Sequence, residues 1–481
     1  MMVPKAFPKA LFSLVPTNPK AHTATSDARN EDRAYKIPDQ GTAIAIGFDN
    51  LSRAGNAYTL ATLGRGHDVD IYVGGSTISK IQCSFEMNLD TSVVMLYDRS
   101  TAQTTQVHGE NATPLEHTRG PPRRVVIDEN LNDVITLGGA AKDLVQFQVL
   151  WHRRLAKALA IDTEKKSVVS QSYLDEAAHN PRVARTQSQE SETELPSRME
   201  TRTHTPKPMQ MRYKKLHLLG SGSFGEVFKA LDLDSGRFMA VKRMYLRNPR
   251  DYDHARKREV ETLARIRHPH ILEFIHSEGW DIPNADVLIF MELKDGSLGS
   301  LLKNKERMGS SQQVQMIARM VFEQMLQALD FLACNNVVHR DVKPDNILYL
   351  LPRGDGKFRF QLGDFGLCNP HDNASSNVGT PIFAAPERLS GRQTPKFDVW
   401  SLMVTMLWTL HFDSFVTEME RSQESQILPI VMKFVSRSDF SPIGAMAKIN
   451  PDERASAAQL LARWFNGKGL TTPPMSITPL G

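Results

Sequence analysis

The sequence predicts a multidomain chain in which an all-β sandwich precedes a larger α+β domain. Three observations support this prediction. Residues 41–153 contain short apolar runs separated by Gly, Asn and Asp, residues 154–210 are poor in large apolar side chains, and residues 211–467 read first as strands and then as helices. The 481 residues leave room for about two or three domains at roughly 150 residues each.

Composition and charge exclude several classes of protein. Apolar residues make up 41% and charged residues 23%, which are globular values, so the chain is not disordered throughout. The net charge of +4 does not call for a nucleic acid or an anionic membrane as partner. No apolar run approaches the roughly 18 residues that span a bilayer, so we expect no membrane partner. The three cysteines (Cys83, Cys334 and Cys368) cannot form a disulfide framework and predict an intracellular, reducing compartment.

The two ends of the chain are predicted to be tails. Residues 1–40 are rich in Pro, Ser, Thr and charge, which is typical of disorder. Their prolines would also break the amphipathic helix of a transit peptide. Residues 468–481 are short and Pro-rich, and we expect them to fray.

Residues 41–153 are predicted to form the β-sandwich. Their apolar runs are TAIAIGF, VDIYV, IQCSF, SVVMLYD, RRVVID and VQFQVLW, and turn residues separate them. Short strands at this spacing are typical of two packed antiparallel sheets.

Residues 154–210 are predicted to be a flexible linker. Eleven of the 44 residues from Ser167 to Gln210 are Ser or Thr, a composition that buries no core. The linker contains the pairs Ser170-Gln171, Thr186-Gln187 and Ser188-Gln189, a mild excess over chance. A polar linker with accidental pairs remains the alternative.

Residues 211–467 begin with strand-like segments and continue with helical patterns such as residues 313–334. A glycine-rich turn, GSGSFGEV, lies between the first two strand-like segments, where glycines let backbone N–H groups approach phosphate oxygens. Lys242 then ends the strand AVK, and a helix with Glu259 follows it. HRDVKPDN (339–346), DFG (364–366) and GTPIFAAPE (379–387) complete the series.

In this order and spacing these motifs resemble the eukaryotic protein kinases, whose fold is bilobal and α+β. The resemblance implies an ATP- and Mg²⁺-dependent transfer of phosphate to protein substrates. It implies Asp341 as the base for the substrate hydroxyl, Lys343 as a partner of the γ-phosphate, and Asn346 and Asp364 as Mg²⁺ ligands. The residues implied for ATP binding are Gly220, Gly222, Gly225, Val227, Lys242, Glu259, Met291, Glu292 and Leu293.

Further details of the resemblance concern specificity and bracing. Lys343 and Thr380 match the Ser/Thr-specific pattern, and Leu298 replaces an acidic residue of kinases that prefer Arg near the target. Glu387 and Arg454 match a buried ion pair. Met403 replaces the usual Gly of D-x-W-S-x-G, so we expect altered helix packing with little loss of chemistry.

The segment from Asp364 to Glu387 is predicted to contain a phosphorylation switch. Arg340 precedes the predicted base, and a phosphate on Ser376, or on its neighbour Ser375, is expected to pair with it. Two ordinary loop serines are the alternative.

The sandwich resembles a forkhead-associated (FHA) domain, which implies binding of phosphothreonine peptides. Arg65, Ser79 and Lys80 stand at the positions of the phosphate ligands, and a guanidinium, a hydroxyl and an ammonium suit a phosphate. Two residues depart from the pattern: Gln82 replaces a structural His, and Ala102 replaces an Asn that holds the peptide backbone. A degenerate sandwich that makes only protein contacts is the alternative.

The order of FHA-like sandwich, linker and kinase resembles the DNA-damage checkpoint kinases. It implies phosphothreonine-containing protein partners and a nuclear location, with the cytoplasm as an alternative. Phosphorylated Thr186 is the predicted ligand of the sandwich, either in the same chain or in a second copy. Binding by a second copy would produce self-association. A phosphothreonine-binding adaptor with a scaffold kinase domain is the alternative function. A DNA-binding protein is a weaker one, since no basic stripe is apparent and we expect no direct nucleic-acid partner.

Overall fold

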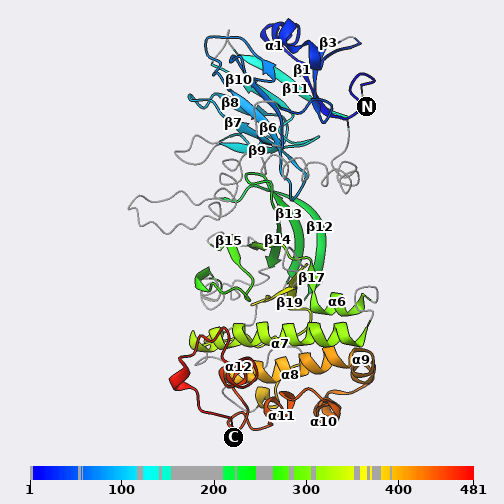
Figure 1. The fold of residues 1–481 in the computed structure, drawn as a ribbon, viewed down its shortest axis with the longest axis vertical. Coiled ribbons are helices and arrows are strands. Elements are labelled where there is room, and N and C mark those ends of the chain that lie inside the picture. The colour runs from blue at the N-terminus through cyan, green and yellow to red at the C-terminus, as the bar shows by residue number, and fades with distance from the viewer. Residues whose placement is uncertain are drawn as a thin grey trace. The chain divides into compact units, whose positions relative to one another are not determined.

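The computed structural model describes residues 4–152 and 210–480, apart from residues 39, 53–55, 57, 116–122, 140–143, 223–224, 245–259, 261–263, 281–285, 305–309, 352–357, 366–368, 371–380 and 390–392. The predicted linker therefore lies almost entirely outside the described residues. The contacts divide the chain into two compact units (Figure 1). The first is Met1–Leu216 with Ala230–Phe238, and the second is His217–Lys229 with Met239–Gly481.

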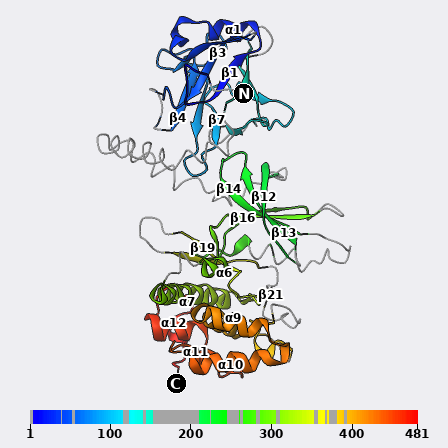
Figure 2. The same ribbon diagram turned by 90° about the vertical axis from the view of Figure 1, so that its right-hand side faces the viewer.

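The first unit contains a β-sandwich, as predicted (Figure 2). One sheet has the strand order β2 (Ala34–Ile37), β3 (Gly41–Gly47), β1 (Ala10–Pro16), β11 (Val145–Trp151), β10 (Val134–Leu137), β8 (Thr105–His108). The other has the order β5 (Ile71–Tyr72), β4 (Thr59–Gly64), β6 (Cys83–Met87), β7 (Val94–Asp98), β9 (Arg124–Ile127). Both sheets contribute to one buried core, in which the ring centres of Phe12 and Phe85 lie 5.2 Å apart.

The prediction of a disordered tail over residues 1–40 is wrong. Strand β1 lies between β3 and β11, and all seven of its residues are buried. Helix α1 (Pro19–Thr25) and the 3₁₀ turn η1 (Ala28–Arg33) follow it. The prolines mark the ends of these elements: Pro16 closes the strand, and Pro19 begins the helix behind the Asn18 cap, where its missing N–H costs nothing. An average over 40 residues concealed the apolar run ALFSLVP.

The second unit combines a sheet with a helical layer (Figure 1). The sheet has the order β12 (Tyr213–Gly222), β13 (Gly225–Asp232), β14 (Phe238–Met244), β16 (Val287–Glu292), β15 (Phe274–Glu278). The helices named among its described residues are α6 (Leu298–Lys303), α7 (Ser311–Cys334), α8 (Lys396–Leu410), α9 (Phe412–Glu420), α10 (Ile427–Arg437), α11 (Ile443–Met446) and α12 (Ala457–Phe465). Residues 230–238, at the tip of the β13–β14 hairpin, belong to the first unit.

Helix α7 is the centre of the helical layer. The Ser310 side chain caps it by accepting the Gln313 N–H, and buried residues recur along one face at helical spacing, among them Ile317, Val321 and Met325. No single helix in the described part of the chain is long and apolar enough to cross a membrane, although α8 and α9, bent by 114°, reach that length and composition together.

The end of the chain is held against α7, so the expectation that it frays is wrong. Asp330 of α7 accepts the backbone N–H groups of Thr471 and Thr472 at 2.7 and 3.0 Å, and the Thr472 hydroxyl at 2.5 Å. Three hydrogen bonds to one carboxylate fix the chain at this point because charged acceptors form strong bonds.

Candidate active site

The loop between β18 (Val337–Val338) and β19 (Ile347–Leu350) brings the predicted catalytic residues together. The Nζ of Lys343 lies 2.7 Å from Oδ2 of Asp341, and the Nδ2 of Asn346 donates to the same oxygen at 2.9 Å. Nδ2 also donates to the Asp341 carbonyl at 2.8 Å. The carboxylate of Asp341 is therefore held in one orientation by a cation and an amide.

Helix α8 anchors this loop. The buried carboxylate of Asp398 accepts the backbone N–H groups of His339 and Arg340 at 2.7 and 2.8 Å. Arg340 has a φ of 74°, a left-handed conformation that is rare for a residue with a side chain. Burial raises the pKa of Asp398 to about 7. The two backbone N–H donors stabilise the charged carboxylate and so offset part of this rise in pKa. They also hold the loop in its strained conformation.

The segment after β20 (Arg359–Leu362) brings Asp364 beside this loop. The Gly363 N–H donates to the Asn346 carbonyl at 2.8 Å, and the Gly363 carbonyl lies 3.0 Å from Nε2 of buried His339. Burial lowers the pKa of His339 to about 4, so its ring is neutral at pH 7. The Nζ of Lys242 on β14 forms an ion pair with Oδ1 of Asp364. The predicted catalytic and metal-binding residues are thus joined through short contacts.

The donor set fits a magnesium ion. Carboxylate and amide oxygens are the ligands that Mg²⁺ prefers. The two hydrogen bonds that the Asn346 side chain makes to Asp341 both use its nitrogen, so its Oδ1 is held in place and keeps its capacity as an acceptor. Asp364 contributes a partly exposed carboxylate from the neighbouring segment.

The predicted adenine and phosphate residues lie on strands of the sheet, most of them at the strand ends. Met291 and Glu292 are the last residues of β16, opposite Ala240 and Met239 of β14, and Leu293 follows them. Gly220 and Gly222 end β12, and Gly225 begins β13 with a φ of 131°. A Cβ at Gly225 would lie 1.9 Å from the Arg243 carbonyl oxygen, so the close approach of β13 and β14 requires glycine there. Val227 lies on β13, half-buried.

Several predicted residues lie outside the described part of the chain: Glu259, Thr186, Ser375, Ser376 and Thr380. Among the described residues, the guanidinium of Arg340 is buried and its Nε donates to Oε1 of Gln393 at 2.8 Å. Gln393 is a site residue that the sequence did not reveal, because no motif marks a buried glutamine in a loop.

The predicted ion pair between Glu387 and Arg454 is confirmed. Arg454 makes two parallel bonds to the carboxylate, at 2.6 and 2.9 Å, and its side chain is fully buried. Its guanidinium carbon also lies 5.1 Å from the ring centre of Trp400 on α8. A bidentate, desolvated pair of this kind fixes geometry as well as charge.

A second candidate site lies on the sandwich, where the structure brings Arg65, Ser79 and Lys80 together. The Arg65 N–H donates to the Ser79 carbonyl at 3.0 Å, and its Nε donates to the Ile78 carbonyl at 2.6 Å. Arg65 and Lys80 are exposed and Ser79 is half-buried. Two cations and a hydroxyl thus share one end of the sandwich.

Gln82, which departs from the FHA pattern, has a structural role. It is fully buried; its Oε1 accepts the Ser79 N–H at 2.9 Å, and its Nε2 donates to the hydroxyls of Thr104 and Thr105 at 3.0 and 3.1 Å. One amide therefore ties the Ser79 loop to the loop that carries exposed Ala102.

Comparison with known proteins matches residues 213–465 to the protein kinase domain. The chain belongs to the protein kinase family. It is 28% identical over 282 residues to human NUAK family SNF1-like kinase 1, across 55% of this chain and 40% of that protein. The rat Serine/threonine-protein kinase DCLK1 is 30% identical over 278 residues, across 55% of this chain and 62% of that protein. The chain thus spans less than two thirds of the length of these two kinases.

One relative aligns with more of the chain than its kinase domain. The DNA damage response protein kinase DUN1 of Saccharomyces cerevisiae is 25% identical over 448 residues, across 85% of this chain and 83% of that protein. The alignment therefore extends well beyond residues 213–465.

Proposed function

We propose that the chain is an ATP- and Mg²⁺-dependent Ser/Thr protein kinase. The observation that carries this proposal is the joined cluster of Asp341, Lys343, Asn346, Asp364 and Lys242. The similarity to a protein named as a Serine/threonine-protein kinase, DCLK1, supports Ser and Thr hydroxyls as the phosphate acceptors.

Each residue of the cluster has a role in the proposed reaction. Asp341, oriented by Asn346, accepts the proton of the substrate hydroxyl, and Lys343 beside it stabilises negative charge on the transferred phosphoryl group. Lys242 binds the α- and β-phosphates, and the hinge residues Glu292 and Leu293 bind adenine. Asn346 and Asp364 would hold Mg²⁺, which would neutralise charge on the phosphate oxygens.

The test is phosphorylation of a Ser/Thr peptide library by the purified full chain. Asp341→Asn is expected to lower the rate about 100-fold or more, because a general base typically contributes that much. Asp345→Asn is the matched control, since Asp345 is an exposed carboxylate in the same loop. Equal rates for wild type and Asp341→Asn would leave a phosphothreonine-binding adaptor with a scaffold kinase domain as the function.

We further propose that the sandwich is an FHA-like phosphothreonine-docking module. The convergence of Arg65, Ser79 and Lys80 at one end supports it, and Gln82 supports the loop without the usual His. The extended alignment with a kinase named for the DNA damage response supports a checkpoint role. A nuclear location is part of the same proposal and rests on the resemblance to checkpoint kinases alone.

Thr186 in the linker is the proposed ligand, in the same chain or a second copy. A linker of this length gives the phosphorylated segment a local concentration at the sandwich on the order of millimolar, so a weak affinity is enough for docking. Docking onto a second copy would bring two kinase domains together and favour phosphorylation of Ser376 in trans. A titration of the phosphatase-treated full chain with a peptide centred on phosphorylated Thr186 tests this. Arg65→Ala should abolish binding and Lys36→Ala, at an exposed lysine of β2, should not. Equal binding of the unphosphorylated peptide would contradict phosphate-directed docking.

A further inference from the structure

The outer face of strands β7 and β9 is apolar and yet buried. Val94 and Leu96 of β7 point into the core of the sandwich, and Met95, which alternates with them, is only 1% exposed. On β9, Val126 is fully buried on the same outer side. One face of an antiparallel sheet in a sandwich ordinarily meets water, so another element covers this face.

The covering element is the tip of the β13–β14 hairpin, residues 230–238. Leu231 and Leu233 pack against Met95, Val126 and their neighbours, and both leucines are no more than 3% exposed. The Val126 N–H donates to the Leu233 carbonyl at 2.9 Å, which pairs the hairpin with the free edge of β9. The contact therefore combines apolar packing by Leu231 and Leu233 with a backbone hydrogen bond to the edge of β9.

The turn of the hairpin fits the sandwich closely. The Thr91 hydroxyl donates to the Gly236 carbonyl at 2.7 Å, and the Arg124 Nε donates to the Asp234 carbonyl at 2.9 Å. Gly236 has a φ of 69°, and a Cβ there would lie 2.6 Å from the Met95 sulfur. The left-handed turn therefore favours glycine, and a side chain there would also have to displace the Met95 sulfur.

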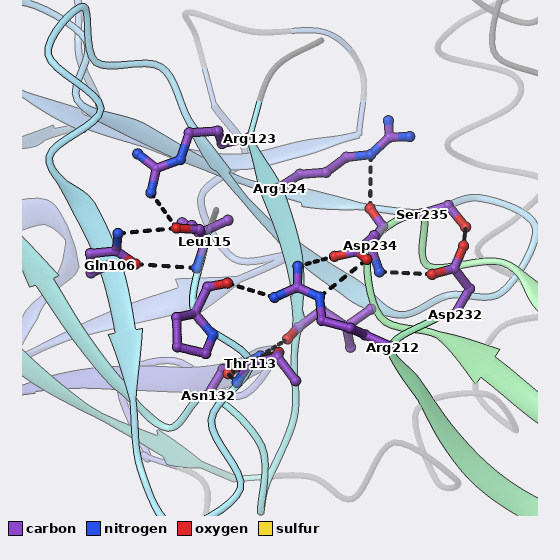
Figure 3. Close-up of polar contacts among 12 residues, drawn as sticks. Gln106, Thr113, Leu115, Arg123, Arg124, Asn132, Arg212, Asp232, Asp234 and Ser235 are labelled. Atoms are coloured by element: carbon purple, nitrogen blue, oxygen red, sulfur yellow. Dashed lines mark hydrogen bonds and ion pairs between the residues drawn. The ribbon is translucent and has the colours of Figure 1, made fainter. Parts of the chain in front are cut away.

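Charged side chains lie beside this apolar contact, and Figure 3 shows the ion pair of Arg212 with Asp234. Arg212, in the segment that precedes β12, forms an ion pair with Asp234 and donates to the Pro114 carbonyl at 2.5 Å. Lys214 pairs with Asp128 in the turn after β9. The polar border and the apolar centre match the arrangement of a specific protein interface.

This surface lies at the opposite end of β6 from the phosphate-directed loops. Ser79–Gln82 lead into the start of β6 at Cys83, whereas the strand ends at Met87 and continues into the turn of residues 88–92 that holds Gly236. The hairpin therefore leaves the loops that carry Arg65, Ser79 and Lys80 uncovered.

We propose that residues 88–97 and 124–131 of the sandwich form a docking site for the hairpin 230–238 of the same chain, independent of phosphorylation. The hairpin's strands continue into the sheet that carries Val227 on β13 and Lys242 on β14. Docking thus braces, at their far end, the two strands proposed to bind the ATP phosphates.

Hydrogen exchange of the phosphatase-treated full chain tests the proposal from both sides. Leu233→Asp is expected to raise exchange at least severalfold in residues 88–97 and 124–131, and Met95→Lys to do the same in residues 230–238. Residues 10–16 of β1 and 311–334 of α7 report whether each variant is folded. Arg237→Ala is the matched control, because Arg237 is exposed in the same hairpin and no hydrogen bond or ion pair of its side chain is found among the described residues.

A change in hydrogen exchange that is confined to the segment carrying the substitution would overturn the proposal. An equal effect of Arg237→Ala would overturn it as well. Loss of protection on dilution would assign the contact to a second copy and overturn docking within one chain. If either apolar variant fails to fold, Arg212→Ala and Asp234→Ala replace it. Each should raise exchange near Val126 by roughly two- to fivefold, as expected for a surface ion pair, and the double variant should add little.

Discussion

At the residue scale, single polar side chains hold the loops of both candidate sites. Gln82 is the clearest case, because one buried amide satisfies a backbone N–H and two hydroxyls. Its removal leaves the Ser79 N–H and the hydroxyls of Thr104 and Thr105 without that partner, next to a position that is itself fully buried. An unsatisfied buried group costs about 1–3 kcal/mol, so the effect on the loop is larger than the bonds themselves are worth.

Gln82→Ala is therefore expected to destabilise the sandwich by about 1–3 kcal/mol and to weaken phosphopeptide binding at Arg65 and Lys80. Gln82→His, which restores the residue of the FHA pattern, should retain binding because imidazole also accepts and donates. Denaturant unfolding and a peptide titration measure the two effects. Unchanged binding by Gln82→Ala would show that the loop does not need this amide.

Lys242 provides a second residue-scale prediction. Lys242→Met should lower the rate of phosphoryl transfer about 100-fold or more while the fold survives, because the variant keeps the apolar stem and loses the charge that meets Asp364 and the proposed phosphates. A single-turnover assay measures the rate, and Lys303→Met, at an exposed lysine of α6, is the control. A near-normal rate would remove Lys242 from the proposed site.

At the element scale, helix α8 shows why a departure from a motif need not weaken a fold. Met403 stands where the D-x-W-S-x-G motif has Gly, and its side chain is fully buried in the core of the second unit. Altered helix packing at this position stays a prediction. Met403→Gly should destabilise the chain by about 2–5 kcal/mol, since it leaves a cavity and places Gly within a helix. Denaturant unfolding that shifts by less than about 1 kcal/mol would contradict this account.

The contact between α7 and the loop before β15 predicts a dependence on pH. His268 stacks on Phe331 of α7 with ring centres 5.0 Å apart, and its Nδ1 accepts the His270 N–H at 3.1 Å. Burial, with the neighbouring His270, lowers the pKa of His268 to about 4. The folded state thus binds this proton less readily than the unfolded chain, whose His titrates near a pKa of about 6.5.

This contribution to stability is present above a pH of about 6.5 and is lost as the pH falls toward about 4. We expect the melting temperature of the second unit to decrease between about pH 7 and pH 5, and His268→Asn, which keeps an acceptor for the i+2 amide, to show a smaller decrease. Calorimetry at constant ionic strength measures both. An equal decrease in the variant would assign the pH dependence to other groups.

At the scale of the whole molecule, periodicity predicted the sandwich and the helical layer, and motif spacing predicted the joined residues Asp341, Lys343, Asn346 and Asp364. Average composition failed at β1, because a seven-residue strand is a small part of the 40-residue window in which its apolar character was averaged. The hairpin contact was also missed, although the sequence held a signal. SVVMLYD and RRVVID are apolar on both alternating faces, which indicates strands covered on both sides.

The docking proposal leads to a kinetic prediction about the whole chain. If the sandwich braces the β13–β14 hairpin, its release makes the strands that carry Val227 and Lys242 less well ordered, and ATP must then order them on binding. Leu233→Asp and Met95→Lys should therefore raise the KM for ATP by about three- to tenfold, because an ordering cost of roughly 1 kcal/mol corresponds to a factor of about five. The KM for the peptide should change less.

Steady-state kinetics at varied ATP measures this effect, with Arg237→Ala as the control in the same hairpin. The leucines of the hairpin pack on the outer face of β7 and β9, and the polar contacts that border them lie at the same end of the sandwich. Arg65→Ala, at the other end, should therefore leave the KM for ATP unchanged. A lower KM in Leu233→Asp would mean that the docked hairpin restrains the kinase instead of bracing it. Since Met95→Lys removes the same contact from the other partner, agreement between the two variants separates the effect of docking from local damage to either strand.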